Sequence, residues 1–492
     1  MDYSQFLVMH HEIGLLVLIL LIFLFDTFSS KESPRGFSMF SVCLFALFVV
    51  AGFVYPWRQE TAAAFGGMYA ASPVMTAIKN VLNIGVLIVL IQSMKWADSE
   101  FMRVRRGEFY ELLLITLFGM YLMISARHFL LFIIGLETAS LPLAALVAFD
   151  KNRYESHEAA VKYILTAVFS SAIFMMGLSF VYALAGTLYF ADIAASLVNG
   201  GAMLIVAIAF VIAGMGFKLS LVPFHLWTAD VYQGAPTSVT SYLSVISKGS
   251  AAFAFFVILV QVFGPFYHGI WEWMLYALII LTITVGNLFA LRQKNLKRFL
   301  AFSSISQAGY IMLGVIAASA PGLGSLIFYV LVYIFSNLAA FGVISAIENK
   351  TGRVDMDSYN NLYSTNPKLA FTMMLAMFSL AGIPPFAGFF SKFFIFSAGV
   401  ASGSMALYIL VLIALINTIV SLYYYLLVVK AMFINNQEPC AIATFRSADS
   451  ERLGMWICVV GIILVGLVSC IYNGIIDTSV MNTEYIFTIF AN

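Results

Sequence analysis

Stretches of about 20 apolar residues recur along this chain from Leu15 to Ile471, and about fourteen of them can be distinguished. One helix of about 20 residues crosses the hydrocarbon core of a bilayer. The 492-residue chain is 62% hydrophobic and only 10% charged, with a mean hydropathy of +0.97. Soluble domains carry about a quarter charged residues, which excludes a soluble fold. We therefore expect an all-α polytopic membrane protein with about 14 transmembrane helices.

The composition indicates neither a redox cofactor nor a nucleic-acid partner. A net charge of +1 supplies no field that would attract an acidic polymer. The cysteines Cys43, Cys440, Cys458 and Cys470 show no paired spacing, so no disulfide framework, zinc site or iron–sulfur site is indicated. The sequence contains no Gly-rich dinucleotide or phosphate loop. We expect this chain to hold no cofactor and no metal.

The basic residues of the predicted loops gather on one side of the membrane. Because the first basic residue is Lys31, no cleavable signal peptide is indicated, and residues 12–28 are expected to form the first true span. The poorer side has only Arg58 and Arg127, so the positive-inside rule makes the richer side cytoplasmic and both termini periplasmic. The richer side contains Lys31, Arg35, Lys95, Arg103, Arg105, Arg106, Lys151, Arg153, Arg292, Lys294, Lys297, Arg298, Lys350, Arg353, Lys368, Lys430, Arg446 and Arg452.

The predicted spans form four groups: three helices in residues 1–106, five in 107–265, five in 266–433, and a last helix with its tail in 434–492. The fourth helix of each group of five is interrupted, at Pro223 in the first group and at Pro384-Pro385 in the second. Such breaks are tolerated at membrane depth only inside protein or beside water. Paired broken helices suggest two structural repeats. Since each repeat has an odd number of spans, the second is expected to be inverted.

A few charged residues fall inside predicted spans, where each costs at least about 2.5–3.5 kcal/mol at the bilayer centre. The only acid near the middle of a span is Glu137. One interpretation is a neutral carboxyl hydrogen-bonded to neighbouring Thr or Ser. The favoured one pairs Glu137 with Lys218, because intramembrane acids are usually functional. The basic residues inside spans are Lys79, Lys162, Lys218, Lys248 and Lys392.

Lys218, Lys248 and Lys392 are expected to form a row of proton carriers, with Lys248 at its centre and Lys392 at its exit. Removal from water makes a lysine release its proton more readily, and a nearby acid opposes that effect. The alternative is a set of structural ion pairs or of side chains that snorkel to an interface. That alternative is weak for Lys218 and Lys248, because the spans contain too few acids to pair with every lysine.

Two further residues, Lys162 and His225, each allow a functional and a structural interpretation. A third, Lys79, favours the structural one. Lys162 lies near the cytoplasmic side and fits either a relay or an ion pair. His225, two residues after Pro223, fits either a relay or a hydrogen bond at a helix start. Lys79 lies close to the outer end of its span, so we expect it to snorkel.

Several long segments resemble one family of membrane proteins. The segment PFHLWTADVYQGAPT at residues 223–237, which leads into Ser247-Lys248, is similar to subunit N of bacterial NADH:quinone oxidoreductase (respiratory complex I), one of the antiporter-like membrane subunits. Matching segments are EAAVKY at 158–163, GNLFALRQKNLKR at 286–298, SSISQAGY at 303–310, and LAGIPP at 380–385 with Lys392. The likeness covers most of residues 100–430, and motifs of this length are specific.

The resemblance implies an antiporter-like fold in which Glu137, Lys218, Lys248 and Lys392 occupy the positions of the proton-pathway residues. It implies a proton-translocating membrane-arm subunit in the bacterial inner membrane, beside sister antiporter-like subunits and small membrane subunits. Quinone reduction would occur elsewhere in the complex. NADH or another donor, FMN, iron–sulfur clusters and quinone would then belong to other subunits.

Two residues depart from the family pattern. Ala229 stands where relatives usually have proline, and Gln307 stands where subunit N often has histidine. Glutamine cannot titrate, so residue 307 is not expected to carry protons directly, and whether it orients water in the path stays open. Subunit L is disfavoured because no long lateral helix follows the last span. Subunit M is disfavoured because it usually has glutamate at the position of Lys392.

Two other functions stay open at this point. One is a subunit of a multi-subunit cation/proton antiporter, which shares the ancestry. The other is a solitary secondary solute transporter, for which broken helices at mid-membrane are also typical. Such a transporter would need a substrate pocket.

Overall fold

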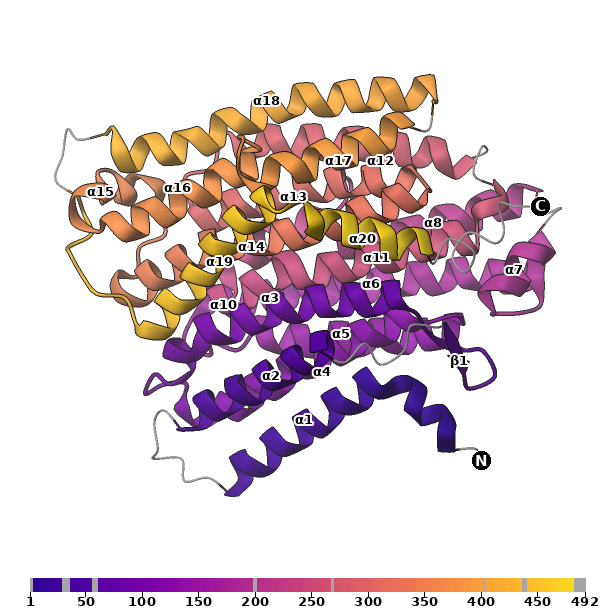
Figure 1. The fold of residues 1–492 in the computed structure, drawn as a ribbon, viewed down its shortest axis with the longest axis horizontal. Coiled ribbons are helices and arrows are strands. Elements are labelled where there is room, and N and C mark those ends of the chain that lie inside the picture. The colour runs from indigo at the N-terminus through magenta and orange to yellow at the C-terminus, as the bar shows by residue number, and fades with distance from the viewer. Residues whose placement is uncertain are drawn as a thin grey trace.

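The computed structural model consists of long helices that lie side by side, with most of their axes along one common direction (Figure 1). It describes residues 3–28, 36–54, 61–197, 201–266, 270–401, 403–435 and 440–481, so Lys31, Arg35 and Arg58 lie outside the described residues. Within these ranges, 13 helices are long and apolar enough to cross a membrane. A broken pair of shorter helices, residues 367–381 and 387–401, supplies the fourteenth expected span. The all-α polytopic fold is confirmed.

The N-terminal region has two peripheral helices and one central helix. Its elements are η1 (Tyr3–Met9), α1 (His10–Phe28), α2 (Gly36–Val54), β1 (Ala62–Ala64), β2 (Tyr69–Ala71) and α3 (Pro73–Ala97). Most of α3 is buried, whereas fewer than half of the residues of α1 and of α2 are buried. The Ser72 side chain accepts a hydrogen bond from the Met75 N–H and so caps α3. The apolar pattern did not predict the β1–β2 hairpin, because three-residue strands are too short to show alternation.

The first group of five spans contains the first break. Its elements are η2 (Arg103–Arg105), α4 (Arg106–Ser125), α5 (Phe129–Val147), α6 (Tyr154–Ala185), α7 (Phe190–Ser196), α8 (Gly201–Leu219), α9 (Leu226–Gly234), α10 (Thr237–Tyr242), the π-helical η4 (Leu243–Ser247), α11 (Lys248–Gln261) and η5 (Gly264–Phe266). The break separates α8 from α9 and contains Pro223, as predicted. The run from α10 through η4 to α11 is buried throughout, so it lies in the middle of the molecule.

The second group contains the second break. Its elements are α12 (Ile270–Ala290), α13 (Leu296–Ile316), α14 (Ala320–Thr351), η6 (Met356–Tyr359), α15 (Leu362–Thr365), α16 (Pro367–Ala381), α17 (Ala387–Ala401) and α18 (Met405–Phe433). Helix α16 ends at Gly382, whose φ of +88° is favourable only for glycine. Pro384-Pro385 follows before α17 begins, which agrees with the predicted interruption.

The same packing recurs in the two groups. Helix α4 packs on α5 as α12 packs on α13, and α11 packs on α4 as α18 packs on α12. Helix α6 contacts both halves of the first broken helix, α8 and α9, and α14 contacts both halves of the second, α16 and α17. This correspondence supports two repeats. Their inverted relation, and the domain boundaries drawn between them, stay predictions.

The C-terminal region differs from its prediction. One span was expected near residues 453–473, but the structure has α19 (Asp449–Leu467) followed by a second helix, α20 (Ser469–Met481). Val468 between them has extended backbone angles, which end α19. Helix α19 starts earlier than expected because the Glu451 carboxylate accepts a hydrogen bond from the Ala448 N–H at 3.0 Å. The apolar composition continues across Val468, so the sequence pattern did not show the bend.

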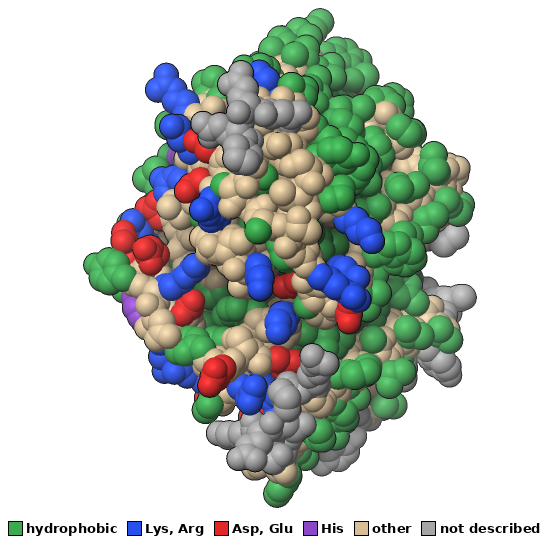
Figure 2. All heavy atoms as spheres, turned by 90° about the vertical axis from the view of Figure 1, so that its left-hand side faces the viewer, with side chains coloured by type: hydrophobic (Ala, Val, Ile, Leu, Met, Phe, Trp, Pro, Cys, Tyr) green, Lys and Arg blue, Asp and Glu red, His purple; other side chains and the backbone are tan. Residues whose placement is uncertain are grey.

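Charged side chains gather at one end of the helices. Figure 2 shows this face, which has basic and acidic side chains side by side and is framed by hydrophobic surface. It is the end of the molecule at which α15 and the beginning of α10 lie, whereas η1, β1 and α7 lie at the opposite end (Figure 1). The charged end therefore corresponds to the loops predicted to be cytoplasmic. The assignment of this end to the cytoplasm stays a prediction.

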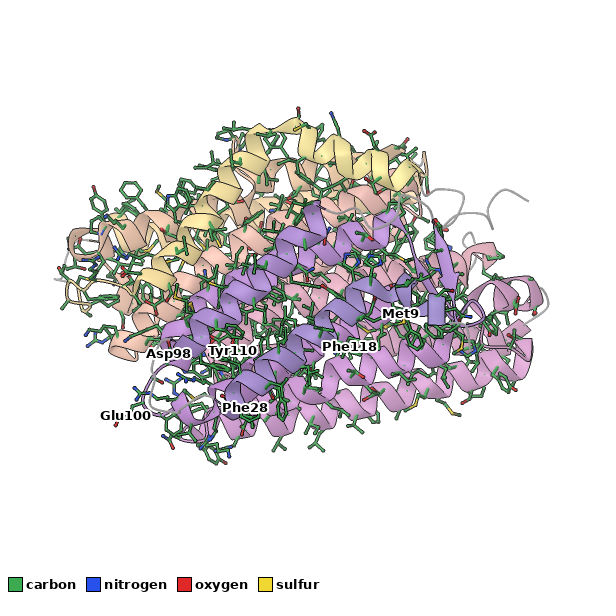
Figure 3. The ribbon with its side chains drawn as sticks, turned by 60° about the horizontal axis from the view of Figure 1, so that its bottom comes forward. Met9, Phe28, Asp98, Glu100, Tyr110 and Phe118 are labelled. Carbon is green, nitrogen blue, oxygen red and sulfur yellow. The ribbon has the colours of Figure 1, made fainter. Side chains whose placement is uncertain are left out.

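Helix α1 lies along the outside of the molecule. It begins directly after Met9, ends at Phe28, and passes Tyr110 and Phe118 of α4, on which it packs (Figure 3). Its outer side chains are large and apolar, for example Leu16, Val17 and Leu20, and they are about half exposed. This surface suits contact with lipid or with another membrane subunit.

Candidate functional site

Lys218 lies in the last turn of α8, just before the first break, and is buried. Its Nζ donates a hydrogen bond to Ser140 Oγ of α5 at 2.6 Å. A small cavity of about 10 Å³ adjoins it, which is room for about one water molecule. The polar side chains that line this cavity are Ser140, Ser170, Ser171 and Lys218.

Glu137 lies on α5 three residues before Ser140, so the two side chains share one face of the helix. Among the described residues no ion pair within 4.0 Å joins Glu137 to Lys218, and Glu137 Oε1 is buried without a hydrogen-bond partner. The Ser140 hydroxyl donates to the Leu136 carbonyl at 2.6 Å instead. The interpretation of Glu137 as a carboxyl held by neighbouring Ser or Thr is therefore wrong.

Lys248 begins α11 where the π-helical segment η4 ends. Such segments inside α-helices are frequent at functional sites. The buried Nζ donates to Ser304 at two atoms, Oγ at 2.8 Å and the carbonyl oxygen at 3.2 Å. It also lies 5.6 Å from the centre of the Tyr232 ring. Ser304 belongs to α13, so Lys248 connects the first group of helices to the second.

A row of hydroxyl and amide side chains continues from Ser304 toward the second break. Ser303, its neighbour, shares a hydrogen bond of 2.5 Å with the Tyr425 hydroxyl. That hydroxyl also accepts from Gln307 Nε2 at 3.1 Å, and Gln307 Oε1 accepts from the Tyr329 hydroxyl. Gln307 thus fixes one tyrosine as its donor and the other as its acceptor. This arrangement agrees with an orienting role for a side chain that cannot titrate.

Lys392 lies on α17 and reaches back to the end of α16. Its buried Nζ donates to the carbonyl oxygens of Leu380 and Ala381, both at 3.0 Å. These carbonyls have no helical partner because α16 stops at Gly382. The Nζ lies 5.3 Å from the centre of the Tyr310 ring. A cavity of about 10 Å³ has a polar lining that comprises Gln307, Tyr329, Tyr333, Ser336, Ser379, Ser391 and Lys392.

Lys162 is part of an ion-pair network at the charged end. Its Nζ lies 2.8 Å from Glu158 and 2.7 Å from Asp230 of α9, and Asp230 also pairs with Arg298 of α13 at 2.6 Å. The Lys162 side chain is 42% exposed, and exposed pairs of this kind contribute about 0–1 kcal/mol each. Sequence reasoning missed Asp230 as a partner, although it lies inside the motif at residues 223–237.

His225 lies at the start of α9 without capping it. Its side chain makes no capping hydrogen bond, and its Nδ1 is buried without a partner. The ring does interact with the Pro223 backbone just before the helix, so a hydrogen bond near the helix start, one of the two interpretations, is present. The imidazole keeps one ring nitrogen available at the first break.

Two buried charged clusters were not predicted. Lys79 does not snorkel, because it is buried and its Nζ lies 2.6 Å from Glu12 Oε1. Lys297, assigned above to a loop, is buried in the first turn of α13, 3.6 Å from Glu348, which also pairs with Arg153 at 2.8 Å. The first cluster could have been found from span parity. Glu12 and Lys79 each follow closely after the start of a span that enters from the same side.

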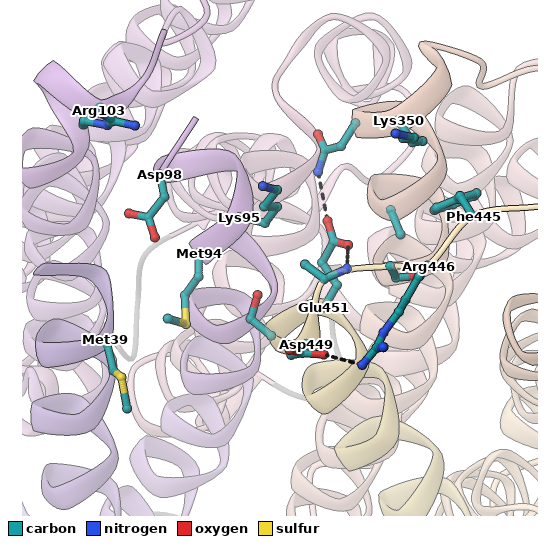
Figure 4. Close-up of a pocket in the computed structure, with 15 residues that line it drawn as sticks. Met39, Met94, Lys95, Asp98, Arg103, Lys350, Phe445, Arg446, Asp449 and Glu451 are labelled. Atoms are coloured by element: carbon teal, nitrogen blue, oxygen red, sulfur yellow. Dashed lines mark hydrogen bonds and ion pairs between the residues drawn. The ribbon is translucent and has the colours of Figure 1, made fainter. Parts of the chain in front are cut away.

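A larger cavity opens on the charged end, away from the relay lysines. Its volume is about 760 Å³, and Figure 4 shows basic and acidic side chains around it. Glu451 accepts from Asn349 at 3.3 Å, and Arg446 pairs with Asp449 at 3.6 Å. The two cavities beside Lys218 and Lys392 have room for water only. Neither of these two cavities beside the broken helices is large enough for a solute.

Comparisons with known proteins decide the family. The model of the family described as "NADH:quinone oxidoreductase/Mrp antiporter, TM" matches residues 126–419. NADH-quinone oxidoreductase subunit N of Azobacteroides pseudotrichonymphae is 52% identical over 96% of this chain and 98% of its own length. The chain belongs to the NADH-quinone oxidoreductase subunit N family.

Solved structures agree with membership of the subunit N family. A chain of respiratory complex I from Thermus thermophilus with bound aureothin is 32% identical, with a TM-score of 0.77 over 93% of this chain and 97% of that chain. A chain of the Mrp complex from Dietzia sp. DQ12-45-1b has a TM-score of 0.85 over 99% and 100% at 20% identity, which shows a shared fold alone. Together these matches confirm the expected function, a proton-translocating membrane-arm subunit.

Proposed function

We propose that the protein moves protons along a lateral row of buried side chains, from Glu137 and Lys218 through Lys248 to Lys392. The observation that carries the proposal is the burial of the three lysines, which are 5%, 2% and 5% exposed. None of them has a carboxylate within 4.0 Å among the described residues. A buried ammonium without a counter-charge is costly, so each amine is suited to release its proton. A structural lysine would resemble Lys162, which has two acidic partners.

Hydrogen bonds supply the steps between the amines. A hydroxyl group that accepts one proton can give up its own, so a proton moves on without a charge staying behind. Ser304 is in contact with Lys248, and its neighbour Ser303 leads to Tyr425 and Gln307. The cavity at Lys392 completes the row with room for about one water. Water is needed between Lys218 and Lys248.

Glu137 is proposed to set the protonation of Lys218. A negative Glu137 near Lys218 favours the ammonium form, and loss of that influence favours release of the proton. The two side chains face Ser140 without forming a closed ion pair, which leaves the coupling adjustable. His225 is proposed as a lesser member on the supply side of the row, because its Nδ1 has no hydrogen-bond partner. Lys162, which is partly exposed and paired with two acids, is proposed to supply a fixed positive charge at this entrance and not to carry protons itself.

The whole assembly is proposed to work as the relatives' names indicate. The chain would act as one translocating subunit of an NADH:quinone oxidoreductase in a bacterial inner membrane, with both termini periplasmic. It would lie beside sister antiporter-like subunits and small membrane subunits. NADH or another donor, FMN, iron–sulfur clusters and quinone are proposed to belong to other subunits, and no redox centre to this one.

A subunit of a multi-subunit cation/proton antiporter is the second candidate, because the Mrp complex shares the fold. Its chain is only 20% identical, whereas the subunit N relative is 52% identical over nearly the full length. Purification of the native assembly distinguishes the two candidates. Electron-transfer subunits that copurify with the chain would support complex I, and a small set of membrane subunits alone would support the antiporter.

The relay is tested in the assembled complex after reconstitution into sealed vesicles. Protons delivered per electron are compared between the wild type and variants in which Lys218, Lys248 or Lys392 is replaced by methionine. Each variant should assemble and deliver fewer protons per electron. Unchanged pumping by all three assembled variants would rule out the lysine row.

A further inference from the structure

The three N-terminal helices contain a buried acid–base cluster that the relay does not use. Glu12 of α1 and Lys79 of α3 are 1% and 2% exposed. Lys79 Nζ donates to Glu12 Oε1 at 2.6 Å and to Ser125 Oγ at 2.8 Å. The Tyr69 hydroxyl donates to the other carboxylate oxygen, Glu12 Oε2, at 2.8 Å. Four elements, α1, β2, α3 and the end of α4, therefore meet at one titratable pair.

Stability alone explains this pair poorly. Two buried charges lose their hydration, and replacing such a pair by apolar side chains of similar size is often neutral or stabilising. Helix α1 already packs on α4 through apolar side chains, so an apolar contact at residue 12 would also hold it. Ionisable residues kept inside a membrane protein are functional candidates by default.

Polar groups lie on the outer side of the pair, toward η1. His11, next to Glu12, is buried, and its Nε2 has no hydrogen-bond partner. Its ring centre lies 4.4 Å from that of His10, which is half-buried at the start of α1. The η1 end of α1 lies opposite the charged end (Figures 1 and 3). The histidines thus connect the pair to the surface that the loop charges predict to be periplasmic.

Polar groups also lie on the inner side, toward Lys248. Lys79 Nζ is 5.3 Å from the centre of the Tyr121 ring, and the Tyr121 hydroxyl hydrogen-bonds to Asn83. About one turn away on α4, Thr116 donates to the Tyr242 hydroxyl at 2.7 Å. Tyr242 ends α10, directly before the π-helical segment that leads to Lys248. Hydroxyl groups therefore lie along the way between the pair and the centre of the relay.

We propose that Glu12 and Lys79 form a second proton-transfer site, a branch from the Lys248 region to the surface at which α1 begins. In the transfer step, an N–H bond of the Lys79 ammonium breaks and an O–H bond forms at Glu12 Oε1, so the ion pair becomes a neutral amine and a carboxylic acid. Glu12 then gives this proton to water beside His11 and His10. The amine regains a proton from the Tyr121 side, and one proton has crossed the site.

This inference rests on the proposed function, because it needs protons in the interior of the protein.

Arg127 is a further charged group near the Glu12–Lys79 pair. Arg127 follows α4 and donates to the Ala126 carbonyl at 2.9 Å, and its Nη2 contacts Met75 Sδ at 3.9 Å, one turn from Lys79 on α3. Among the described residues no ion pair joins Arg127 to Glu12. The carboxylate is thus shared by Lys79 and Tyr69.

The test distinguishes a purely structural Glu12–Lys79 ion pair from a proton-transfer site. The double variant Glu12→Met/Lys79→Met removes both charges and leaves no unpaired one, so the complex should assemble and reduce quinone as the wild type does. The expected result is a loss of protons delivered per electron. If the double variant does not assemble, Glu12→Gln/Lys79→Met, which keeps an acceptor for Tyr69, takes its place. Full pumping by the assembled double variant overturns the inference.

A matched control lies at the other ends of the same helices. Arg106 at the start of α4 and Asp98 after α3 form a pair of 3.7 Å, in which the arginine is buried. The variant Asp98→Leu/Arg106→Met should pump normally, and an equal loss there would overturn the inference. Lys248→Met is measured in parallel. If Lys248→Met pumps fully, the relay itself has failed; if only the Glu12/Lys79 variant pumps fully, the branch alone has failed.

Discussion

Lys248 Nζ donates a hydrogen bond to Ser304 Oγ at 2.8 Å, and this bond joins α11 of the first helix group to α13 of the second. The same helix α13 carries Ser303 and Gln307, which lead toward the second break. The acceptor of Lys248 and the beginning of the onward row are therefore neighbours on one rigid element. Any proton that passes between the two groups by the proposed route passes this contact.

Replacement of Lys248 by either methionine or arginine should interrupt proton transfer. Methionine removes the amine. Arginine keeps the charge but holds its proton up to about pH 12 or above, so it cannot relay. Both Lys248→Met and Lys248→Arg should lower the protons delivered per electron in the reconstituted complex, and the corresponding changes at Lys392 should do the same.

A structural role would give the opposite pattern at these two positions. Arginine would then be tolerated, and methionine would reduce the amount of assembled complex. Lys162 provides the comparison, because it has acidic partners and is partly exposed. Lys162→Arg is expected to leave assembly and pumping unchanged. Normal pumping with arginine at Lys248 and Lys392 would identify these lysines as structural counter-charges.

Glu137→Ala should lower pumping while the complex still assembles. The carboxylate makes no hydrogen bond or ion pair with the described residues, so its removal takes away no native contact of that kind. What it removes is the negative charge near Lys218. Proton delivery and quinone reduction are measured together. Glu137→Gln, which keeps the shape without the charge, should behave like alanine, and full pumping by either assembled variant would contradict the role.

The membrane orientation is tested by labelling in whole cells. Single cysteines replace Arg292, in the loop between α12 and α13, and Gly67, in the β1–β2 hairpin, which lies at the end opposite α15 (Figure 1). A membrane-impermeant thiol reagent added outside should modify the cysteine at position 67 and leave the one at position 292 unmodified until the cells are opened. Modification of position 292 in intact cells would reverse the topology.

The spans and their breaks could be predicted because their causes are local. Apolar stretches of spanning length predict the helices, and Pro223 and Pro384-Pro385 mark the two breaks because proline lacks the amide hydrogen and clashes with the preceding turn. Lys218, Lys248 and Lys392 stood out because a charge far from the ends of an apolar stretch is costly. These features need no knowledge of the neighbouring helices.

The partners of those residues could not be predicted, because they come from distant parts of the chain. Ser304 is 56 residues from Lys248, and Tyr425 is 118 residues from Gln307. Serine and tyrosine are ordinary in membrane helices, so nothing in their local sequence marks them as members of a row. The pairing of Lys79 with Glu12 was missed for a different reason. Snorkelling was judged from the position within one span alone, although span parity places both residues near the same end of the molecule.

Gln307 offers the sharpest test of the row itself, because it cannot carry a proton. Gln307→Leu keeps the size but leaves the Tyr329 hydroxyl without its acceptor and removes one donor to Tyr425. An unsatisfied buried hydroxyl costs about 1–3 kcal/mol, so the complex should assemble with modest loss of stability. Proton delivery should fall between those of the wild type and Lys248→Met, because the order of the hydroxyls is lost while every amine remains.

Gln307→His is the matched variant. An imidazole can accept from one tyrosine and donate to the other, so it should restore proton delivery and assembly together. If the complex with Gln307→Leu delivers as many protons per electron as the wild type, protons do not pass along this row. If Gln307→His lowers proton delivery as much as Gln307→Leu does, the restored hydrogen bonds have no effect. Position 307 would then act through the shape of its side chain.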